Sequence, residues 1–180
     1  MKLSPTSRAI LGVLGLGPRS GYEIKQLVDN STRFFWAASY GQIYPELRRL
    51  GAAGLVEGHA DPASGRGRTV YRLTNTGAKA LRDWLTTGPE VQETRDESLL
   101  KIFFSDFAGP AATLAALEAK AAHHRDVAGR LREIEATAAK DPESSTYLTL
   151  RFGIACNEFA AEFCEREAKR VRSAGRRKAA

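Results

Sequence analysis

At residues 39–56 the chain reads Ser39-Tyr-Gly-Gln-Ile-Tyr-Pro-Glu-Leu-Arg-Arg-Leu-Gly-Ala-Ala-Gly-Leu-Val56, and this segment is the most informative about the architecture. Three apolar side chains recur in it at spacings of four and three, which places them on one buried helical face: Ile43, Leu47 and Leu50. The opposite face carries Gln42, Pro45, Arg48 and Arg49. Glycines at 51 and 54 predict the end of the helix, and an extended segment is expected after them.

Pro45 sets an expectation for where this helix begins. Proline has no backbone N–H to donate, so it fits best in a first helical turn, and the helix is expected to begin near Gly41. The exposed face then offers one amide and two guanidinium groups. These are the groups that reach base edges and phosphates in a DNA major groove.

Three blocks of the sequence resemble the PadR family of bacterial transcriptional regulators. They are Gly21-Tyr-Glu-Ile24, the run from Tyr40 to Leu50 with the Gly54-Leu-Val56 that follows it, and Gly67-Arg-Thr-Val-Tyr-Arg-Leu-Thr74. The resemblance covers most of residues 5–85, with weaker similarity to about residue 170. It implies a winged helix-turn-helix fold. The chain departs from the family pattern at Gly51, where an acidic residue is more usual.

The elements around the central stretch fit this fold. Residues 5–15 and 20–30 predict two helices, and residues 56–73 predict a hairpin, the wing, whose tip spans residues 61–68. Thr74 is expected to cap a further helix that continues to about residue 87. The fold class predicted is mainly α with a small β-hairpin wing, and residues 1–88 form its DNA-binding domain.

The second half of the chain predicts a C-terminal helical dimerisation arm, assigned to residues 89–173 together with an effector site. A long helix over residues 110–139 carries a coiled-coil type of apolar seam, and a last helix is expected over residues 143–172. Two long helices cannot close a core alone, so a second subunit is expected to pack against them. Residues 174–180 are expected to be a basic, disordered tail.

Charge is distributed unevenly along the chain. Residues 1–87 contain 12 Lys and Arg against 6 Asp and Glu, whereas residues 88–180 contain 15 of each, so the net charge of +6 lies in the first part. A basic module favours a polyanion such as DNA as its partner, because each neutralised phosphate releases counterions. On charge alone, an ordinary solvated surface is an equally good interpretation.

Composition indicates a folded globular protein. The chain has 180 residues, of which 43% are hydrophobic and 27% charged. No apolar run approaches the roughly 20 residues that span a bilayer, and the N-terminus lacks a signal-peptide core. A cytoplasmic protein without membrane attachment is therefore expected.

Candidate DNA contacts lie on the central helix, the second helix and the wing. We expect Gln42 to pair with adenine, Arg48 with guanine and Pro45 with a thymine methyl, while Arg49 and Tyr44 hold phosphates. The full set predicted is Tyr22, Ser39, Tyr40, Gln42, Tyr44, Pro45, Arg48, Arg49, Arg66 and Arg68. Instead of contacting DNA, Tyr22 could pack against the central helix, and the wing arginines could belong to a merely solvated loop.

Two further sets of residues are predicted in the arm. An effector cavity is assigned to Phe103, Phe104, Phe107, Phe152 and Phe159, with an ordinary apolar core as the alternative. The dimer interface is assigned to Leu114, Leu117, His124, Leu131 and Phe163. Only the family resemblance implies an effector, which would be a phenolic or other planar aromatic compound that releases DNA.

Enzymatic motifs are missing from the sequence. It has no Gly-rich phosphate loop, no Gly-x-Ser-x-Gly and no His-Glu-x-x-His, and no cofactor or metal is expected. His123 and His124 project about 100° apart on a helix and cannot by themselves hold one metal ion. Cys156 and Cys164 are expected to be reduced, structural thiols.

The function predicted is a homodimeric, ligand-responsive repressor that binds a pseudo-palindromic DNA operator. Two alternatives remain open at this point. One is a winged helix that binds proteins without sequence-specific DNA binding. The other is a DNA-binding regulator that senses a metal or an oxidant through the histidines and cysteines named above.

Overall fold

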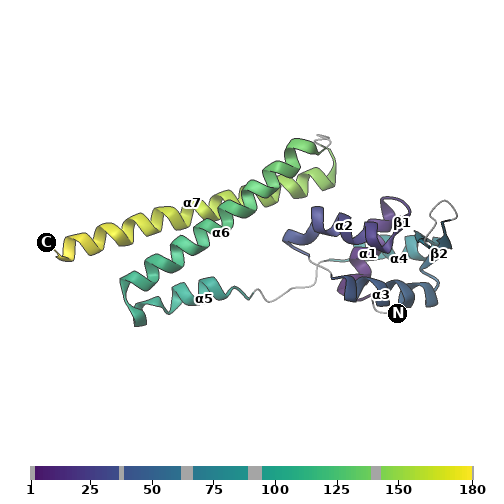
Figure 1. Ribbon diagram of the computed structural model, residues 1–180, viewed down its shortest axis with the longest axis horizontal. Helices are drawn as coiled ribbons and strands as arrows, with labels where there is room; N and C mark the ends of the chain where they lie inside the picture. The colour runs from purple at the N-terminus through teal and green to yellow at the C-terminus, as the bar shows by residue number, and fades with distance from the viewer. Residues whose placement is uncertain (1–2, 37–38, 62–66, 89–94, 139–142, 180) are drawn as a thin grey trace. The chain divides into compact units, whose positions relative to one another are not determined.

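The computed structural model describes residues 3–36, 39–61, 67–88, 95–138 and 143–179. The chain divides into two compact units, residues 1–91 and residues 92–180, and each is described by itself. Figure 1 shows the helices and strands of both units. Among the described residues no helix is both long enough and apolar enough to cross a membrane.

The first unit confirms the predicted fold class, with four main helices and a small sheet. Its helices are α1 (Pro5–Gly15), α2 (Gly21–Asn30), the short 3-10 helix η1 (Thr32–Phe34), α3 (Tyr40–Ala52) and α4 (Asn75–Leu85). Three of these helices have an N-cap residue whose side chain accepts a hydrogen bond from a backbone N–H of the first turn. The N-cap is Ser4 for α1, Ser20 for α2 and Thr74 for α4. Such caps satisfy N–H groups that the first helical turn leaves unpaired.

The sheet has three antiparallel strands in the order β1-β3-β2. The hairpin of β2 (Val56–Ala60) and β3 (Thr69–Leu73) is the predicted wing, with Val56 opposite Leu73 and Ala60 opposite Thr69. The third strand, β1 (Arg19–Ser20), pairs with β3 and was not predicted. Two residues are too few to show a repeating pattern in the sequence.

The core of the first unit is closed by side chains from α1, α2 and α3. The predicted apolar face of α3 is confirmed, because Ile43, Leu47 and Leu50 are each 0% exposed. Its neighbours in the core include Ile10, Leu11, Ile24 and Val28. Gly54 ends α3 with a φ of 67°, a left-handed conformation that glycine adopts without strain.

The position of Pro45 in α3 differs from the prediction. The helix begins at Tyr40 with Ser39 as its N-cap, so Pro45 lies inside the helix rather than in its first turn. A proline at this position removes a backbone hydrogen bond to the carbonyl four residues earlier, that of Gly41. The predicted start near Gly41 is confirmed to within one residue, but the expectation of Pro45 in the first turn was wrong, because a cap formed by Ser39 and Gln42 places the start at Tyr40.

All the regular secondary structure in the described part of the second unit is helical. It contains α5 (Glu97–Phe103), the 3-10 helix η2 (Ser105–Ala108), α6 (Pro110–Thr137) and α7 (Ser145–Ala179). The helices α6 and α7 pack side by side (Figure 1), and the buried side chains between them are Leu117, Ala121, Ala128, Leu131, Ile154, Ala161, Cys164 and Ala168. A salt bridge of 2.6 Å from Lys120 to Asp96, the N-cap of α5, holds the start of α5 against α6.

The end of the chain also differs from the prediction. The helix α7 continues to Ala179, so residues 174–179 are helical and not a disordered tail. This segment is rich in alanine, arginine and lysine, all of which are strong helix formers. The prediction ended the helix at Arg172 because the apolar pattern stops there, but helical propensity continues without it.

Candidate nucleic-acid interface

One face of α3 combines exposed polar and basic groups. Gln42, Pro45 and Arg48 are all exposed on this helix, opposite its buried apolar face. Arg48 forms no hydrogen bond or ion pair with any residue that the structure describes. None of the described residues therefore uses its five N–H donors.

The side chain of Gln42 also forms part of the N-terminal cap of α3. Its side-chain oxygen Oε1 accepts a hydrogen bond from the backbone N–H of Ser39 at 3.0 Å and one from the Ser39 hydroxyl at 3.3 Å. This is the side-chain-to-backbone half of a capping box, which stabilises the start of a helix. Ser39 and Gln42 thus fix the orientation of the first turn of α3.

Arg49, the neighbour of Arg48, is instead hydrogen-bonded to other residues of the same unit. Its guanidinium donates to both carboxylate oxygens of Glu46, at 2.9 and 2.6 Å, and to the hydroxyl of Ser7 at 2.8 Å. Glu46 also accepts hydrogen bonds from Ser4 and Ser7 at the start of α1. The network ties α3 to α1, which leaves Arg49 less free to bind a phosphate than its exposure suggests.

The same network perturbs the titration of Glu46. The hydrogen bonds from Arg49, and then those from Ser4 and Ser7, lower the pKa of Glu46 from its ordinary value of 4.5 to about 2, although burial opposes the shift. A carboxylate that receives several hydrogen bonds is stabilised in its charged form. Glu46 is therefore an anion throughout the physiological pH range.

A polar cleft of about 440 Å³ brings three predicted DNA contacts together. Tyr22 of α2, Tyr44 of α3 and Arg68 beside β3 all line it. The close approach of α2 to α3 requires Gly21, since a Cβ atom there would lie 2.7 Å from the ring of Tyr44. Both tyrosines are substantially exposed, and Gln26 donates a hydrogen bond of 2.9 Å to the hydroxyl of Tyr22.

Arg68 is paired with acidic groups of its own unit. It lies 2.7 Å from Glu23 of α2 and 3.8 Å from Asp61 at the end of β2. Glu23 also accepts from the backbone N–H of Ser20, and this bond, with contributions from the Ser20 hydroxyl and Arg68, lowers the pKa of Glu23. The ion pair connects the base of the wing to the start of α2.

Two predicted contacts cannot be placed. Arg66 lies outside the described residues, and the side chain of Tyr40 is likewise outside them although its backbone is the first residue of α3. The predicted DNA contacts that the structure describes thus fall into three groups. One is exposed on α3, one lines the cleft between α2 and the wing, and the third consists of two arginines paired with carboxylates of the same unit.

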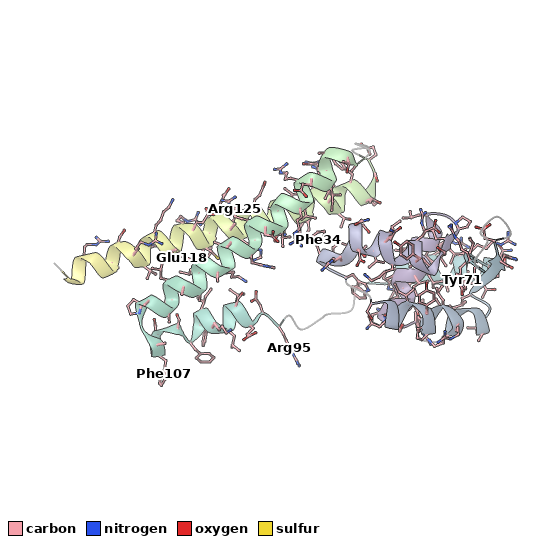
Figure 2. All side chains as sticks on the ribbon, viewed as in Figure 1. Phe34, Tyr71, Arg95, Phe107, Glu118 and Arg125 are labelled. Carbon is pink, nitrogen blue, oxygen red and sulfur yellow. The ribbon has the colours of Figure 1, made fainter. Side chains whose placement is uncertain are left out.

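The described residues of one chain do not enclose the predicted effector cavity. The five phenylalanines assigned to it are between 62% and 100% exposed, and Phe107 projects outward (Figure 2). Side chains so exposed cannot enclose a cavity by themselves. The prediction used the aromatic composition of the segments, which does not reveal whether the side chains face inward.

Most residues assigned to the dimer interface are used inside the chain. Leu117 and Leu131 are buried between α6 and α7 of the same chain, and Leu114 packs against that core. His124 lies with its Nδ1 atom 2.7 Å from Oδ1 of Asn157 on α7. Only Phe163 of this set is exposed, so intrachain packing accounts for the seam that the sequence assigned to a partner.

The candidate sensor residues show no metal-binding arrangement. Among the described residues, no three His, Cys, Asp or Glu side chains gather in a way that would hold a metal ion. Cys164 is buried between α6 and α7, and this burial raises the pKa of its thiol. Cys156 is exposed on α7.

Sequence reasoning missed the residues that hold the arginines. Ser7 is fully buried, yet a serine near a helix start carries no sign of a partner on α3. The spacing of Glu46 and Arg49 was visible, because side chains three apart on a helix are neighbours. Likewise, Ser20 and Glu23 have the spacing of a capping box, which the structure contains.

Comparisons with known proteins identify the family. Residues 10–83 match the model of the "Transcriptional regulator PadR-like family", and residues 94–172 match that of the "Virulence activator alpha C-term" family. The chain belongs to the PadR-like family. The members of this family are transcriptional regulators and not enzymes.

Two comparisons relate the chain to the PadR regulator of Bacillus subtilis. The negative transcriptional regulator PadR of that bacterium is 37% identical over 98 residues, which is 53% of this chain and 54% of the length of that protein. The structure of Bacillus subtilis PadR in complex with operator DNA matches with a TM-score of 0.81 at 25% identity, over 91% of this chain and 97% of that one.

A further solved structure of the same regulator supports the fold alone. Bacillus subtilis PadR in complex with p-coumaric acid matches with a TM-score of 0.78 at 24% identity, over 93% of this chain and 99% of that chain. The winged-helix assignment of the first unit and the helical arm of the second thus agree with PadR structures over nearly their whole length.

Proposed function

We propose that this PadR-type regulator is a homodimeric repressor that binds a pseudo-palindromic operator through α3 and the wing. The observation that carries the proposal is the exposed guanidinium of Arg48, which has no partner among the described residues and shares a face with Gln42 and Pro45. An arginine with free donors binds the O6 and N7 atoms of guanine in the major groove. Repression is supported by the negative regulator of Bacillus subtilis, which is 37% identical over 98 residues.

The cleft between α2 and the wing supplies the contacts that orient the domain. Tyrosine hydroxyls donate to phosphate oxygens, and Tyr22 and Tyr44, both partly exposed residues, line the same cleft. Arg68 is a positioning residue in this proposal, because its pairing with Glu23 holds the wing beside α2. Base contacts therefore come from α3, and backbone contacts from the cleft.

Dimerisation is supported by a second apolar face on α7. One face of this helix, with Ile154, Ala161, Cys164 and Ala168, is buried. A separate face carries the exposed side chains Leu148, Phe152, Phe159 and Phe163. Apolar surface of this extent on a single chain marks an interface, and a second copy with the same face would cover it by two-fold symmetry.

Two-fold symmetry makes the operator pseudo-palindromic. The two copies of α3 would enter successive major grooves, about 34 Å apart along the DNA. An effector would bind where a second copy covers the exposed phenylalanines of α5, η2 and α7. The complex of Bacillus subtilis PadR with p-coumaric acid makes a planar phenolic acid the first compound to test.

The decisive experiment compares two adjacent arginines. Binding of the full chain to DNA from its own promoter region is measured across a salt series for wild type, Arg48→Ala and Arg49→Ala. We expect Arg48→Ala to lose about tenfold in affinity and its preference at one base pair, without a change in the thermal midpoint. Arg49→Ala should lower the thermal midpoint, since Glu46 and Ser7 lose their partner.

The outcomes separate a DNA reader from other uses of a winged helix. Sequence-specific binding that falls steeply with salt supports the proposal. Equal binding to every DNA sequence by wild type and Arg48→Ala, or no binding at all, would overturn it and favour a module that binds proteins.

A further inference from the structure

The structure restricts the hydrogen bonds that Gln42 of α3 can form. A glutamine side chain has one oxygen with two acceptor lone pairs and one NH₂ group with two donors. Here the oxygen Oε1 already accepts from the backbone N–H and from the hydroxyl of Ser39, at 3.0 and 3.3 Å. Both acceptor positions are therefore occupied before any DNA is bound.

The assignment of oxygen and nitrogen in this amide follows from chemistry. The backbone N–H of Ser39 can only donate, so the atom 3.0 Å from it must be the oxygen. The NH₂ group Nε2 is then the remaining polar atom of the side chain. No residue in the described part of the chain accepts a hydrogen bond from it, and Gln42 is exposed.

The two donors determine which base edge Gln42 can bind. Adenine is bound by glutamine through a pair of hydrogen bonds, one accepted by Oε1 from N6 and one donated by Nε2 to N7. That arrangement needs the oxygen which Ser39 occupies. Guanine instead presents two acceptors, O6 and N7, in the major groove and no donor there.

We infer that Gln42 reads DNA only as a hydrogen-bond donor, so that it selects guanine in the operator and not the adenine expected from its residue type. Ser39 is the specificity-determining partner, because it holds the acceptor oxygen. The inference rests on the proposed function, since it assumes that α3 lies in a major groove. It assigns a base preference to that same site.

Substitution of Gln42 by glutamate provides a matched test. Glutamate keeps the oxygen that accepts from Ser39 and completes the Ser-x-x-Glu form of a capping box, so Gln42→Glu should retain the thermal midpoint of wild type. It has no donors, however, and its carboxylate accepts from N4 of cytosine. Gln42→Ala removes both functions and should lower the thermal midpoint.

The experiment selects binding sites from a pool of random DNA with wild type, Gln42→Glu and Gln42→Ala, all as full-length chains. The base pair read by residue 42 is the one whose preference disappears in Gln42→Ala. At this base pair we expect wild type to prefer guanine over adenine by about tenfold, and Gln42→Glu to prefer cytosine at the same base.

Ser39→Gly sharpens the test, because glycine is tolerated as an N-cap but has no hydroxyl. One acceptor position of Gln42 becomes free in this variant, and the preference should move toward adenine. A wild-type preference for adenine at the base pair of residue 42 would overturn the inference.

Two further outcomes separate this inference from the proposed function. If wild type selects a specific site and Arg48→Ala alters it, but Gln42→Ala alters no base pair, the donor reading is wrong and the repressor proposal stands. If wild type selects no sequence, both are wrong.

Discussion

The two units of the chain differ in how completely each buries its own apolar surface. In the first unit, Ile43, Leu47 and Leu50 are fully buried together with residues of α1 and α2. In the second unit, one apolar face of α7 is covered by α6 and another is open, and α5 exposes both Leu99 and Phe103. The comparison indicates that the first unit has a core that one chain completes, whereas the second leaves apolar surface open, which is what the proposed dimer would cover.

Truncation of the closed core should have the largest effect. Leu47→Ala removes a fully buried side chain and should destabilise the first unit by about 2–5 kcal/mol, because it leaves a cavity in addition to the lost burial. Chemical denaturation at several protein concentrations is the measurement. The loss should be the same at every concentration, and a loss that disappears at high concentration would show that a partner also stabilises this core.

Substitution of the open face should act on assembly instead. The double variant Phe152→Ser and Phe159→Ser should raise the dimer dissociation constant at least about a hundredfold, since each change occurs twice in a symmetric dimer. Sedimentation velocity measures it. Leu85→Ser is the matched control, because Leu85 of α4 is 64% exposed and Phe159 is 67% exposed. A monomeric wild type, or an equal effect of both changes, would contradict the assignment of this face.

Acid should weaken the tie between α1 and α3 in the first unit. Folded Glu46 keeps its charge down to a pKa of about 2, whereas its ordinary value is 4.5, so its contribution is present above about pH 4.5 and is lost as the pH falls toward 2. The contribution is about 1–3 kcal/mol.

The measurement is the free energy of unfolding of wild type and Glu46→Gln between pH 2 and pH 7. The difference between the two proteins should be largest at pH 7 and should shrink toward pH 2. A difference that does not depend on pH would show that the charge of Glu46 adds nothing to its packing.

The smallest effect is expected at an ion pair on the surface of the second unit. Arg125 of α6, marked in Figure 2, donates two hydrogen bonds to Glu165 of α7, at 2.8 and 2.9 Å, and both side chains are exposed. Water and salt screen such a pair. Arg125→Ala should lower the thermal midpoint slightly in low salt and not at all in 1 M NaCl, and a loss that persists in high salt would point to packing of the arginine stem.

Local sequence patterns predicted most of the secondary structure. The starts of α1 and α4 were predicted at Pro5 and after Thr74, because a cap and an apolar period are properties of neighbouring residues. The strand β1 was missed, since only its pairing with β3 defines it. Pro45 was expected in the first turn of α3 and lies beyond it, because the cap formed by Gln42 was not considered.

The candidate site was predicted by residue type but not by partner. The sequence placed Arg48 and Arg49 side by side on the exposed face of α3, and nothing local distinguishes two adjacent guanidinium groups. The same limit applied to the arm, where Leu117 and Phe163 both belong to regular apolar patterns. The fold then buried Leu117 under the chain's own α7 and left Phe163 exposed.

By itself, therefore, the sequence determined the order of the helices, the wing, the buried face of α3 and the family. These features depend on periodicity, caps and turns, which act over a few residues. The partners of the two arginines depend on the tertiary structure: Arg49 is bound by Glu46 and Ser7, whereas Arg48 has no partner among the described residues. A hydrogen bond between α1 and α3 joins residues 42 positions apart, and such a contact exists only after the chain has folded.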